Sequence, residues 1–247
     1  NTIYLKEFLN IEDYGDIENV QIIMSILGGD KLYSFEAFNY VEALSKNPIP
    51  DSSLTAQLNK HNYLIFDSKN KAIKVKQGSW KVNQPIIIPP GYKLIIDKKV
   101  KLFFNKNSYI FSHGQVLMLG LKESPIELSS QISSEYWGGI TILGNSELPE
   151  SVFNNVHISN THKIEENGWS TNAGFLTHQI ELKMDNVSFN NNTSEDALNL
   201  VKSIYYLNNI SIKNAVSDGI DSDFSKGEIA DSIFSNIGYL GGGDALD

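Results

Sequence analysis

The chain has 247 residues, 41% of them hydrophobic, and a formal charge of −9, so it can bury a sizeable core but is too acidic for a surface that binds nucleic-acid phosphates. It contains no cysteine, which excludes disulfides, thiolate metal sites and cysteine nucleophiles. No apolar run approaches the roughly 20 residues that a membrane-spanning helix needs.

Residues 1–80 have a mixed pattern that predicts a small α/β cap or separate domain. Ser34 is a suitable N-cap for a helix over 35–44, where apolar residues recur at helical spacing. The apolar run 20–27 fits either a buried helix or a strand, and periodicity does not decide between them. Residues 71–76 alternate apolar residues with lysines, which predicts a half-exposed strand.

Residues 81–247 have a different rhythm. Short apolar runs, such as 86–88, 94–96 and 109–111, follow one another at steps of about eight residues, broken by Gly, Asn, Ser or Lys. The breaks lack the dipeptides of two-residue hairpins, so neighbouring runs are not expected to pair with each other. The pattern favours pairing of each strand with its equivalent one repeat later.

The repeat can be counted. Residues 196–214 align without a gap on residues 218–236 at an offset of 22, and Gly174-Phe175 precedes Ala197-Leu198 at an offset of 23. A period of 22–23 residues with three short strands predicts an all-β fold, the right-handed parallel β-helix with three sheets. Leucine-rich repeats need a frame that is absent here, and propeller blades need about 40 residues.

Asparagine recurs at one position of this repeat, and it predicts a ladder of stacked side chains at a bend. Asparagine tolerates the left-handed backbone angles that a bend requires. The ladder consists of Asn160, Asn191, Asn214 and Asn236. We interpret the glycosylation sequons that begin at Asn186 and Asn209 as by-products of the same stacking.

The extra residues of the repeat are expected at one corner, directly after the asparagine ladder. Thirteen steps separate Asn160 from the start of the next strand, and eight separate Asn236 from Asp244, against five and four elsewhere. The long insertion carries Trp169 and the shorter one carries Tyr239, both candidates for stacking on a ligand.

Beside that corner we expect two columns of mainly acidic side chains: Asp196, Asp218 and Asp244, placed in the bend, and Asn199, Asp221 and Asp247, pointing outward. Stacked carboxylates about 4.8 Å apart repel each other and raise at least one pKa. A carbohydrate cleft would explain this arrangement, with the acids serving hydrolysis, epimerisation or Ca²⁺-assisted elimination. Alternatively, the aspartates only cap tight turns through their own side chains.

The cleft hypothesis assigns three kinds of residue. The catalytic candidates are Asp218, Asp221 and Asp244, and the substrate-binding candidates are Trp169, Tyr239, Asn199, Lys202 and Asp196. The cofactor that this hypothesis allows is a Ca²⁺ ion at Asp221, Asp223 and Asp247. Lys202 is placed near Asp221 by the repeat, where it would neutralise the acidic column.

The stretch from Pro85 to Asp247 resembles the pectate-lyase-like right-handed β-helix superfamily. More narrowly, it is similar to uncharacterised bacterial β-helix repeat modules, which carry the phrases found here at 137–140, 195–199, 217–225 and 243–247. Ser217-Asp218-Gly219-Ile220-Asp221 also resembles the Asn-Thr-Asp-Gly-Ile-Asp motif of polygalacturonase-type glycoside hydrolases, which implies acid roles for Asp218 and Asp244. The second motif of that family, Gly-Asp-Asp, keeps one acid here, and its Gly-His-Gly and Arg-Ile-Lys motifs are absent.

These observations predict a secreted or cell-surface bacterial β-helix that binds or modifies a polysaccharide. The competing interpretation is a non-catalytic structural or interaction module. The last residues, Leu246 and Asp247, fall in the middle of a coil, so we expect either further coils or end-to-end association with another copy.

Overall fold

The computed structural model describes residues 21–25, 30–36, 53–145, 147–166 and 168–247. Its contacts divide the chain into two units, residues 1–47 and 48–247, which are described separately. In the first unit, β1 (Gln21–Ser25) pairs with β2 (Leu32–Glu36) in antiparallel fashion. The apolar run 20–27 therefore contains a strand. Ser34 lies inside β2 and does not cap a helix there, and most of the helix expected over 35–44 falls outside the described residues.

The second unit opens with α2 (Leu54–Lys60), the only helix among the described residues. The hydroxyl of Ser53 accepts the backbone N–H of Ala56 at 3.2 Å and caps the first turn. Gln57 is fully buried, and its side-chain oxygen accepts the backbone N–H of Ile87 at 2.9 Å. The helix thus satisfies a backbone donor of β6 (Ile86–Ile88), the outermost strand at that end of its sheet.

The remaining strands of the second unit form two large sheets, apart from one small hairpin. The six-stranded sheet runs in the order β20 (Asp218–Asp223), β18 (Asp196–Val201), β16 (Phe175–His178), β12 (Ile140–Leu143), β9 (Ile110–Ser112) and β6. The twelve-stranded sheet contains β3 (Leu64–Asp67), β4 (Ala72–Val75), β5 (Gly78–Val82), β7 (Lys93–Asp97), β8 (Val100–Phe104), β10 (Val116–Leu119), β11 (Ile126–Ser130), β13 (Ser151–Thr161), β17 (Glu181–Asn192), β19 (Ile204–Ala215), β21 (Lys226–Ala230) and β22 (Ile233–Ile237).

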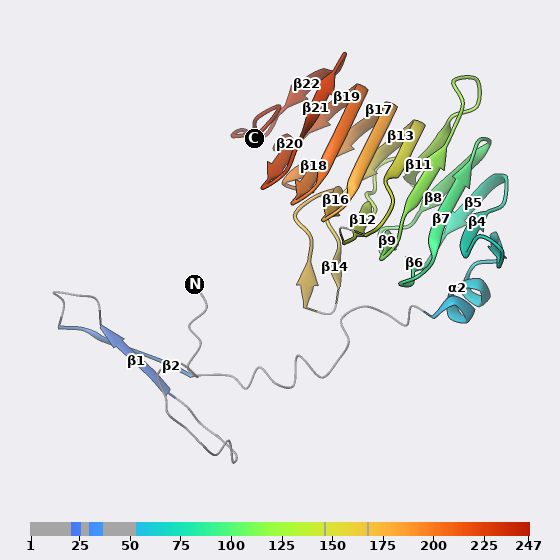
Figure 1. Cartoon of the computed structure of the whole chain (residues 1–247). Coiled ribbons are helices and arrows are strands. Elements are labelled where there is room, and N and C mark those ends of the chain that lie inside the picture. Colours follow the sequence, from blue (N-terminus) through green and yellow to red (C-terminus); the bar gives the residue numbers. More distant parts are fainter. Residues whose placement is uncertain (1–20, 26–29, 37–52, 146, 167) are drawn as a thin grey trace. The chain divides into compact units, whose positions relative to one another are not determined.

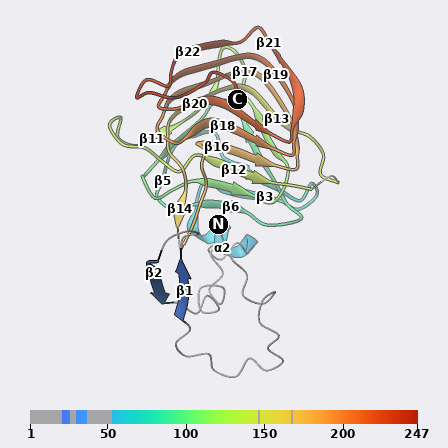
Figure 2. The same cartoon turned by 90° about the vertical axis from the view of Figure 1, so that its left-hand side faces the viewer.

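Pairing in both sheets is parallel, except for the antiparallel pair of β3 and β4. Leu198 pairs with Ile220, and Met184 pairs with Leu207, so the offsets of 22 and 23 counted in the sequence are the register of the sheets. Figures 1 and 2 show the strands stacked in chain order from the α2 end to β22. The second unit is therefore mostly β, with parallel sheets built from strands one repeat apart.

Single residues with left-handed backbone angles turn the chain between sheet segments. One column is the expected ladder, in which each side chain donates to the preceding one: Asn191 to Asn160, Asn214 to Asn191 and Asn236 to Asn214. A second ladder bends the long strands β13, β17 and β19 in their middle, at Asn155, Asn186 and Asn209. A third column, at the end of the six-stranded sheet, uses Gln179, Lys202 and Phe224.

The expectation that all insertions enter at one corner is wrong. Residues 144–150 separate β12 from β13, whereas only Gln179 and Ile180 separate β16 from β17 at the same corner of the next repeat. The expected corner does hold the longest insertion, residues 162–174, between β13 and β16. The number of residues after each ladder asparagine measures insertions at one corner only. The insertion between β12 and β13 lies at another corner and was therefore not predicted.

Candidate functional site

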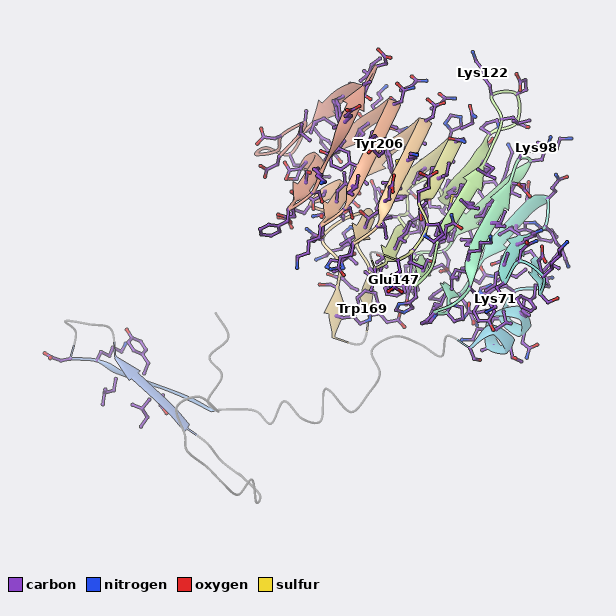
Figure 3. The ribbon with its side chains drawn as sticks, in the orientation of Figure 1. Lys71, Lys98, Lys122, Glu147, Trp169 and Tyr206 are labelled. Atoms are coloured by element: carbon purple, nitrogen blue, oxygen red, sulfur yellow. The ribbon has the colours of Figure 1, made fainter. Side chains whose placement is uncertain are left out.

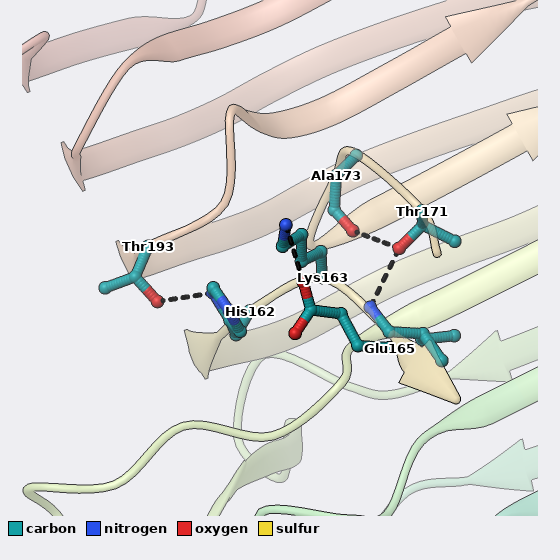
Figure 4. Close-up of polar contacts among 7 residues, drawn as sticks. His162, Lys163, Glu165, Thr171, Ala173 and Thr193 are labelled. Atoms are coloured by element: carbon teal, nitrogen blue, oxygen red, sulfur yellow. Dashed lines mark hydrogen bonds and ion pairs between the residues drawn. The ribbon is translucent and has the colours of Figure 1, made fainter. Parts of the chain in front are cut away.

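The long insertion forms a small antiparallel hairpin of β14 (Glu165–Glu166) and β15 (Trp169–Ser170). Contacts at the base of the hairpin fix its orientation on the sheet (Figure 4). The hydroxyl of Thr171 accepts the backbone N–H of Ile164 at 2.8 Å and donates to the carbonyl of Ala173 at 3.3 Å. Lys163 and Glu165 form an ion pair of 2.7 Å. The hairpin is therefore held at both ends of its base.

The hairpin covers part of the outer face of the six-stranded sheet. Its residue Trp169, labelled in Figure 3, packs edge-on against Phe111, with ring centroids 5.7 Å apart, and against Tyr109 at 6.3 Å. The hydroxyl of Tyr109 donates to Glu166 at 2.5 Å, which ties the hairpin to the sheet. Burial and the carboxylate of Glu166 both raise the pKa of Tyr109, so its hydroxyl remains a donor.

Between the hairpin and the sheet lies a pocket of about 540 Å³, which we call the aromatic pocket. Its walls are mainly apolar side chains with a few hydroxyls and one amide: Phe111, Thr141, Leu143, Trp169, Ser170, Thr171, Asn172 and Leu176. A pocket of this size with an apolar lining and few polar groups is typical of small-ligand and sugar sites. The insertion therefore builds a concave site on an otherwise regular sheet.

An acid cluster, consisting of Asp196, Asp218, Asp221 and Asp247, continues the same face of the sheet beyond this pocket. Leu176 of the pocket pairs in register with Asn199, and Asn199 pairs with Asp221. The side-chain nitrogen of Asn199 donates to the carboxylate of Asp196 at 2.8 Å and to that of Asp221 at 3.1 Å. The pocket and the cluster are thus adjacent.

Asn172 joins the pocket to the cluster through a side-chain hydrogen bond. It lines the pocket, and its amide nitrogen donates to Asp196 at 2.8 Å. Asp196 is 1% exposed. Burial is the main reason that the pKa of Asp196 is raised to about 7, and Asp221 and Glu195 raise it further against the opposing hydrogen bond from Asn199. A proton therefore titrates at the edge of the pocket near neutral pH.

Within the described ranges, no ion pair balances the charge of the cluster. The ion pairs among the described residues belong to Lys74, Lys101, Lys163 and Lys183, and none of their partners is an acid of the cluster. Burial, and then the charges of Asp223 and Asp247, raise the pKa of Asp221 above its usual range. The cluster is a region of concentrated negative potential.

Asn199 has a further unusual feature. It is 1% exposed and lies on the face of β18 opposite the core residues Leu198 and Leu200. Its amide nitrogen makes two hydrogen bonds, but its buried amide oxygen has no hydrogen-bond partner among the described residues. A buried carbonyl oxygen without a donor is rare and costs free energy, so it calls for a physical explanation.

The structure brings together some of the residues that the sequence grouped. Asp196, Asn199, Asp218 and Asp221 lie on neighbouring strands, and Trp169 stands over the adjoining pocket. The carboxylate of Asp218 accepts the backbone N–H of Asp244, 26 residues later, at 2.7 Å, so it links one repeat to the next. Asp218 therefore supports the stacking of the repeats, whereas Asp221 accepts a hydrogen bond from Asn199.

Two other predicted residues lie elsewhere. Lys202 follows β18 at the end opposite Asp196 and lines a separate pocket with Asn145 and Gln179. Tyr239 is 43% exposed in the segment after β22 and does not line the aromatic pocket. The backbone N–H of Lys202 donates to the carbonyl of Asp223 at 2.7 Å, but no ion pair in the described ranges joins its side chain to an acid.

No group of three or more His, Cys, Asp or Glu side chains in the described part of the chain is arranged to hold a metal ion. Calcium at Asp221, Asp223 and Asp247 therefore stays a prediction without geometric support. Sequence reasoning missed Asn172, Phe111 and Leu176. The repeat could have found Leu176, which lies one register step before Asn199, whereas the position of Asn172 depends on the path of the insertion.

No helix in the described ranges is long and apolar enough to cross a membrane. Comparisons with protein-family models, with curated proteins and with solved structures found no match to this chain.

Proposed function

We propose that this chain is a secreted or cell-surface protein that binds a polysaccharide along the outer face of its six-stranded sheet. The observation that carries the proposal is the position of Trp169, which an insertion holds over a pocket directly beside the acid cluster. An aromatic ring packs on the apolar face of a sugar, while carboxylates and amides accept bonds from sugar hydroxyls.

The proposal includes the fold expected from the sequence, a right-handed parallel β-helix. Parallel pairing at offsets of 22 and 23, and three columns of left-handed corner residues, support it. The right-handed sense rests on the general rule that crossovers between parallel strands are right-handed in about 98% of cases. Adjacent strands lie about 4.8 Å apart, roughly the length of one sugar unit, so a polysaccharide running along the stack meets one repeat per sugar.

A catalytic role extends the proposal through Asp221. Asp196 is almost fully buried, whereas Asp221 is half-buried and is the acid of the bridged pair that a bound sugar can reach. Two carboxyl groups that share one amide nitrogen lie closer together than the roughly 6.5–9.5 Å typical of inverting glycosidases. Because Asp196 is also buried away from a bound sugar, the pair does not supply the two carboxyl groups that a glycosidase needs. Lyase or epimerase chemistry, which would use Asp221 as an acid–base group, fits the site better.

The alternative is a structural or interaction module without catalysis. The contact that favours it is the hydrogen bond from the backbone N–H of Asp244 to Asp218, because it gives one acid a structural role between successive repeats. A substitution of Asp218 distinguishes the two functions. If the acids only have structural roles, Asp218→Ala, which removes the accepting oxygen, lowers the melting temperature and the wild-type chain binds no glycan.

The test is a binding screen of the full chain against a panel of neutral, acidic and amine-bearing glycans, with reducing-end release measured in parallel. We expect at least one class to bind, and Trp169→Leu to weaken that binding about tenfold or more. The matched control is Tyr206→Leu, which removes another partly exposed aromatic on β19, labelled in Figure 3. Absence of binding to every glycan, or equal binding by Trp169→Leu, rejects the proposed function.

A further inference from the structure

We infer that the ligand carries protonated amino groups, so that a polysaccharide containing free amino sugars fits the acid cluster, whereas one built of uronic acids does not. This inference rests on the proposed function and names its substrate class. It follows from the kinds of hydrogen-bonding groups and charges at the edge of the aromatic pocket.

The first step concerns hydrogen-bond partners. The amide nitrogen of Asn199 uses both of its hydrogens, on Asp196 and Asp221, and that of Asn172 uses one, on Asp196. The groups left over are acceptors: the carboxylates of the cluster, which bind several donors each, and the buried amide oxygen of Asn199, which has no partner among the described residues. Apart from the second N–H of Asn172 and the proton that Asp196 holds below about pH 7, the site offers acceptors, and an ammonium group brings three donors.

The second step concerns charge. Burial, and then the charges of Asp223, Asp247 and Asp218, disfavour the ionised form of Asp221. No ion pair in the described structure involves any of these residues. A uronic acid would add another negative charge to this region. An amino sugar would instead place a positive charge where several negative charges have no counter-ion, and charge-assisted hydrogen bonds are stronger than neutral ones.

The third step concerns position. Leu176, which lines the pocket, is the strand neighbour of Asn199, and Asn199 is the neighbour of Asp221. These neighbours are spaced about 4.8 Å apart along the stack. A sugar ring held against Trp169 and Leu176 therefore places the amino group of the next sugar beside Asn199 and Asp221. The apolar and acidic parts of the face are thus one sugar apart.

The experiment compares three oligosaccharides of equal length on the full chain by isothermal titration calorimetry. They are a glucosamine oligomer, its fully N-acetylated form, which has the same backbone without the charge, and an oligogalacturonate. We expect the glucosamine oligomer to bind about tenfold or more tightly than either of the others. Its affinity should also fall with added salt, because the charges lie at a solvent-facing site.

Two variants locate the effect. Asp221→Asn and Asp247→Asn each remove one charge of the cluster, and each should weaken binding of the glucosamine oligomer severalfold without changing binding of the N-acetylated form. The control is Asp231→Asn, the same charge change at an exposed residue of another corner, where asparagine suits the left-handed backbone. It should leave all affinities unchanged. Circular dichroism checks that each variant is folded. If one of the two cluster variants does not fold, the other alone tests the inference.

The outcomes separate this inference from the proposed function. Equal binding of the glucosamine and N-acetylated oligomers, or tighter binding of the oligogalacturonate, overturns the inference while polysaccharide binding survives. Loss of affinity in the Asp231→Asn control as large as in Asp221→Asn also overturns it, because the attraction would then come from net charge alone. Failure of every glycan to bind overturns the proposed function itself.

Discussion

The side chain of Asn191 donates a hydrogen bond of 3.0 Å to the side chain of Asn160, although 31 residues separate them. In the following repeats the same bond joins residues 23 and 22 apart. The β14–β15 hairpin lies within the longer interval. The insertion therefore leaves the ladder intact, and the site is built on a repeat that does not depend on it.

This relationship predicts that removing residues 163–170 leaves a folded protein. The strands on either side, β13 and β16, keep their pairings, while Ile87 and Phe111 lose their cover. We expect a β-type circular dichroism spectrum, a cooperative transition and a loss of about 2–4 kcal/mol in unfolding free energy, the typical value for uncovering two large apolar side chains. Denaturant titration measures it. A chain without a cooperative transition would contradict this independence.

A second prediction concerns the ladder itself. Asn191 has a φ of 59° and forms hydrogen bonds with Asn160 and Asn214. Asn191→Ala should reduce the free energy of unfolding by about 2–4 kcal/mol, because it removes two hydrogen bonds and puts alanine in the left-handed region. Asn191→Gly should lose about 1 kcal/mol less than alanine, since glycine adopts that region freely.

The control for the ladder is Asn107→Ala, which changes an exposed asparagine in a turn and should cost less than about 0.5 kcal/mol. Chemical denaturation of the three variants at one pH gives the order. If the alanine and glycine variants at position 191 are equally stable, the backbone angle does not contribute and the ladder acts through hydrogen bonds alone.

A third prediction concerns the small residue that stands directly before a large apolar one in successive repeats, as Gly174 and Ala197 do. A methyl group on Gly174 would lie 2.4 Å from the side-chain oxygen of Asn192 and 2.5 Å from that of Thr161. These two side chains are hydrogen-bonded to each other and buried, so they cannot move freely. Gly174→Ala should therefore destabilise the protein by about 1–3 kcal/mol.

The reciprocal control is Ala197→Gly, one repeat later in the same column, which should cost about 1 kcal/mol through backbone entropy and lost burial. Thermal melting of both variants checks the pair. Unchanged stability of Gly174→Ala would mean that the side chains of Asn192 and Thr161 move to accommodate the methyl group. Steric exclusion would then not explain the small residue at this position.

The repeat explains which features of the fold could be predicted from the sequence. Strand partners share side-chain types, so the alignment of Leu198 with Ile220 identified neighbours in the sheet without any coordinates. The corner at Gln179, Lys202 and Phe224 was not predicted, because these residue types do not mark left-handed backbone as asparagine and glycine do.

The candidate site could be predicted only in part, for a different physical reason. Register places Asn199 beside Asp221, but burial depends on what covers the sheet. Asp196 is buried and held by Asn172, a residue of the insertion. An insertion occurs in one repeat only, so no periodicity predicts its path, its contacts or the pocket beneath Trp169.

The fourth prediction concerns the pH dependence of stability. The pKa of Asp196 is raised from its ordinary value of 3.8 to about 7, chiefly by burial. Between these two pH values the folded chain keeps a proton that the unfolded chain has released. The stability linked to this proton is therefore fully present below pH 3.8 and is lost as the pH rises through about 7.

Asp196→Asn tests this linkage, because the amide keeps an oxygen that can accept from Asn172 and Asn199 but never ionises. We expect the variant to match the wild type near pH 4 and to exceed its unfolding free energy by about 2 kcal/mol at pH 8, a value reduced to allow for solvent screening. Denaturant titrations at several pH values measure the difference. The exposed Asp97→Asn should show no such trend. A constant difference between Asp196→Asn and wild type across this range would show that Asp196 does not hold its proton in the folded chain.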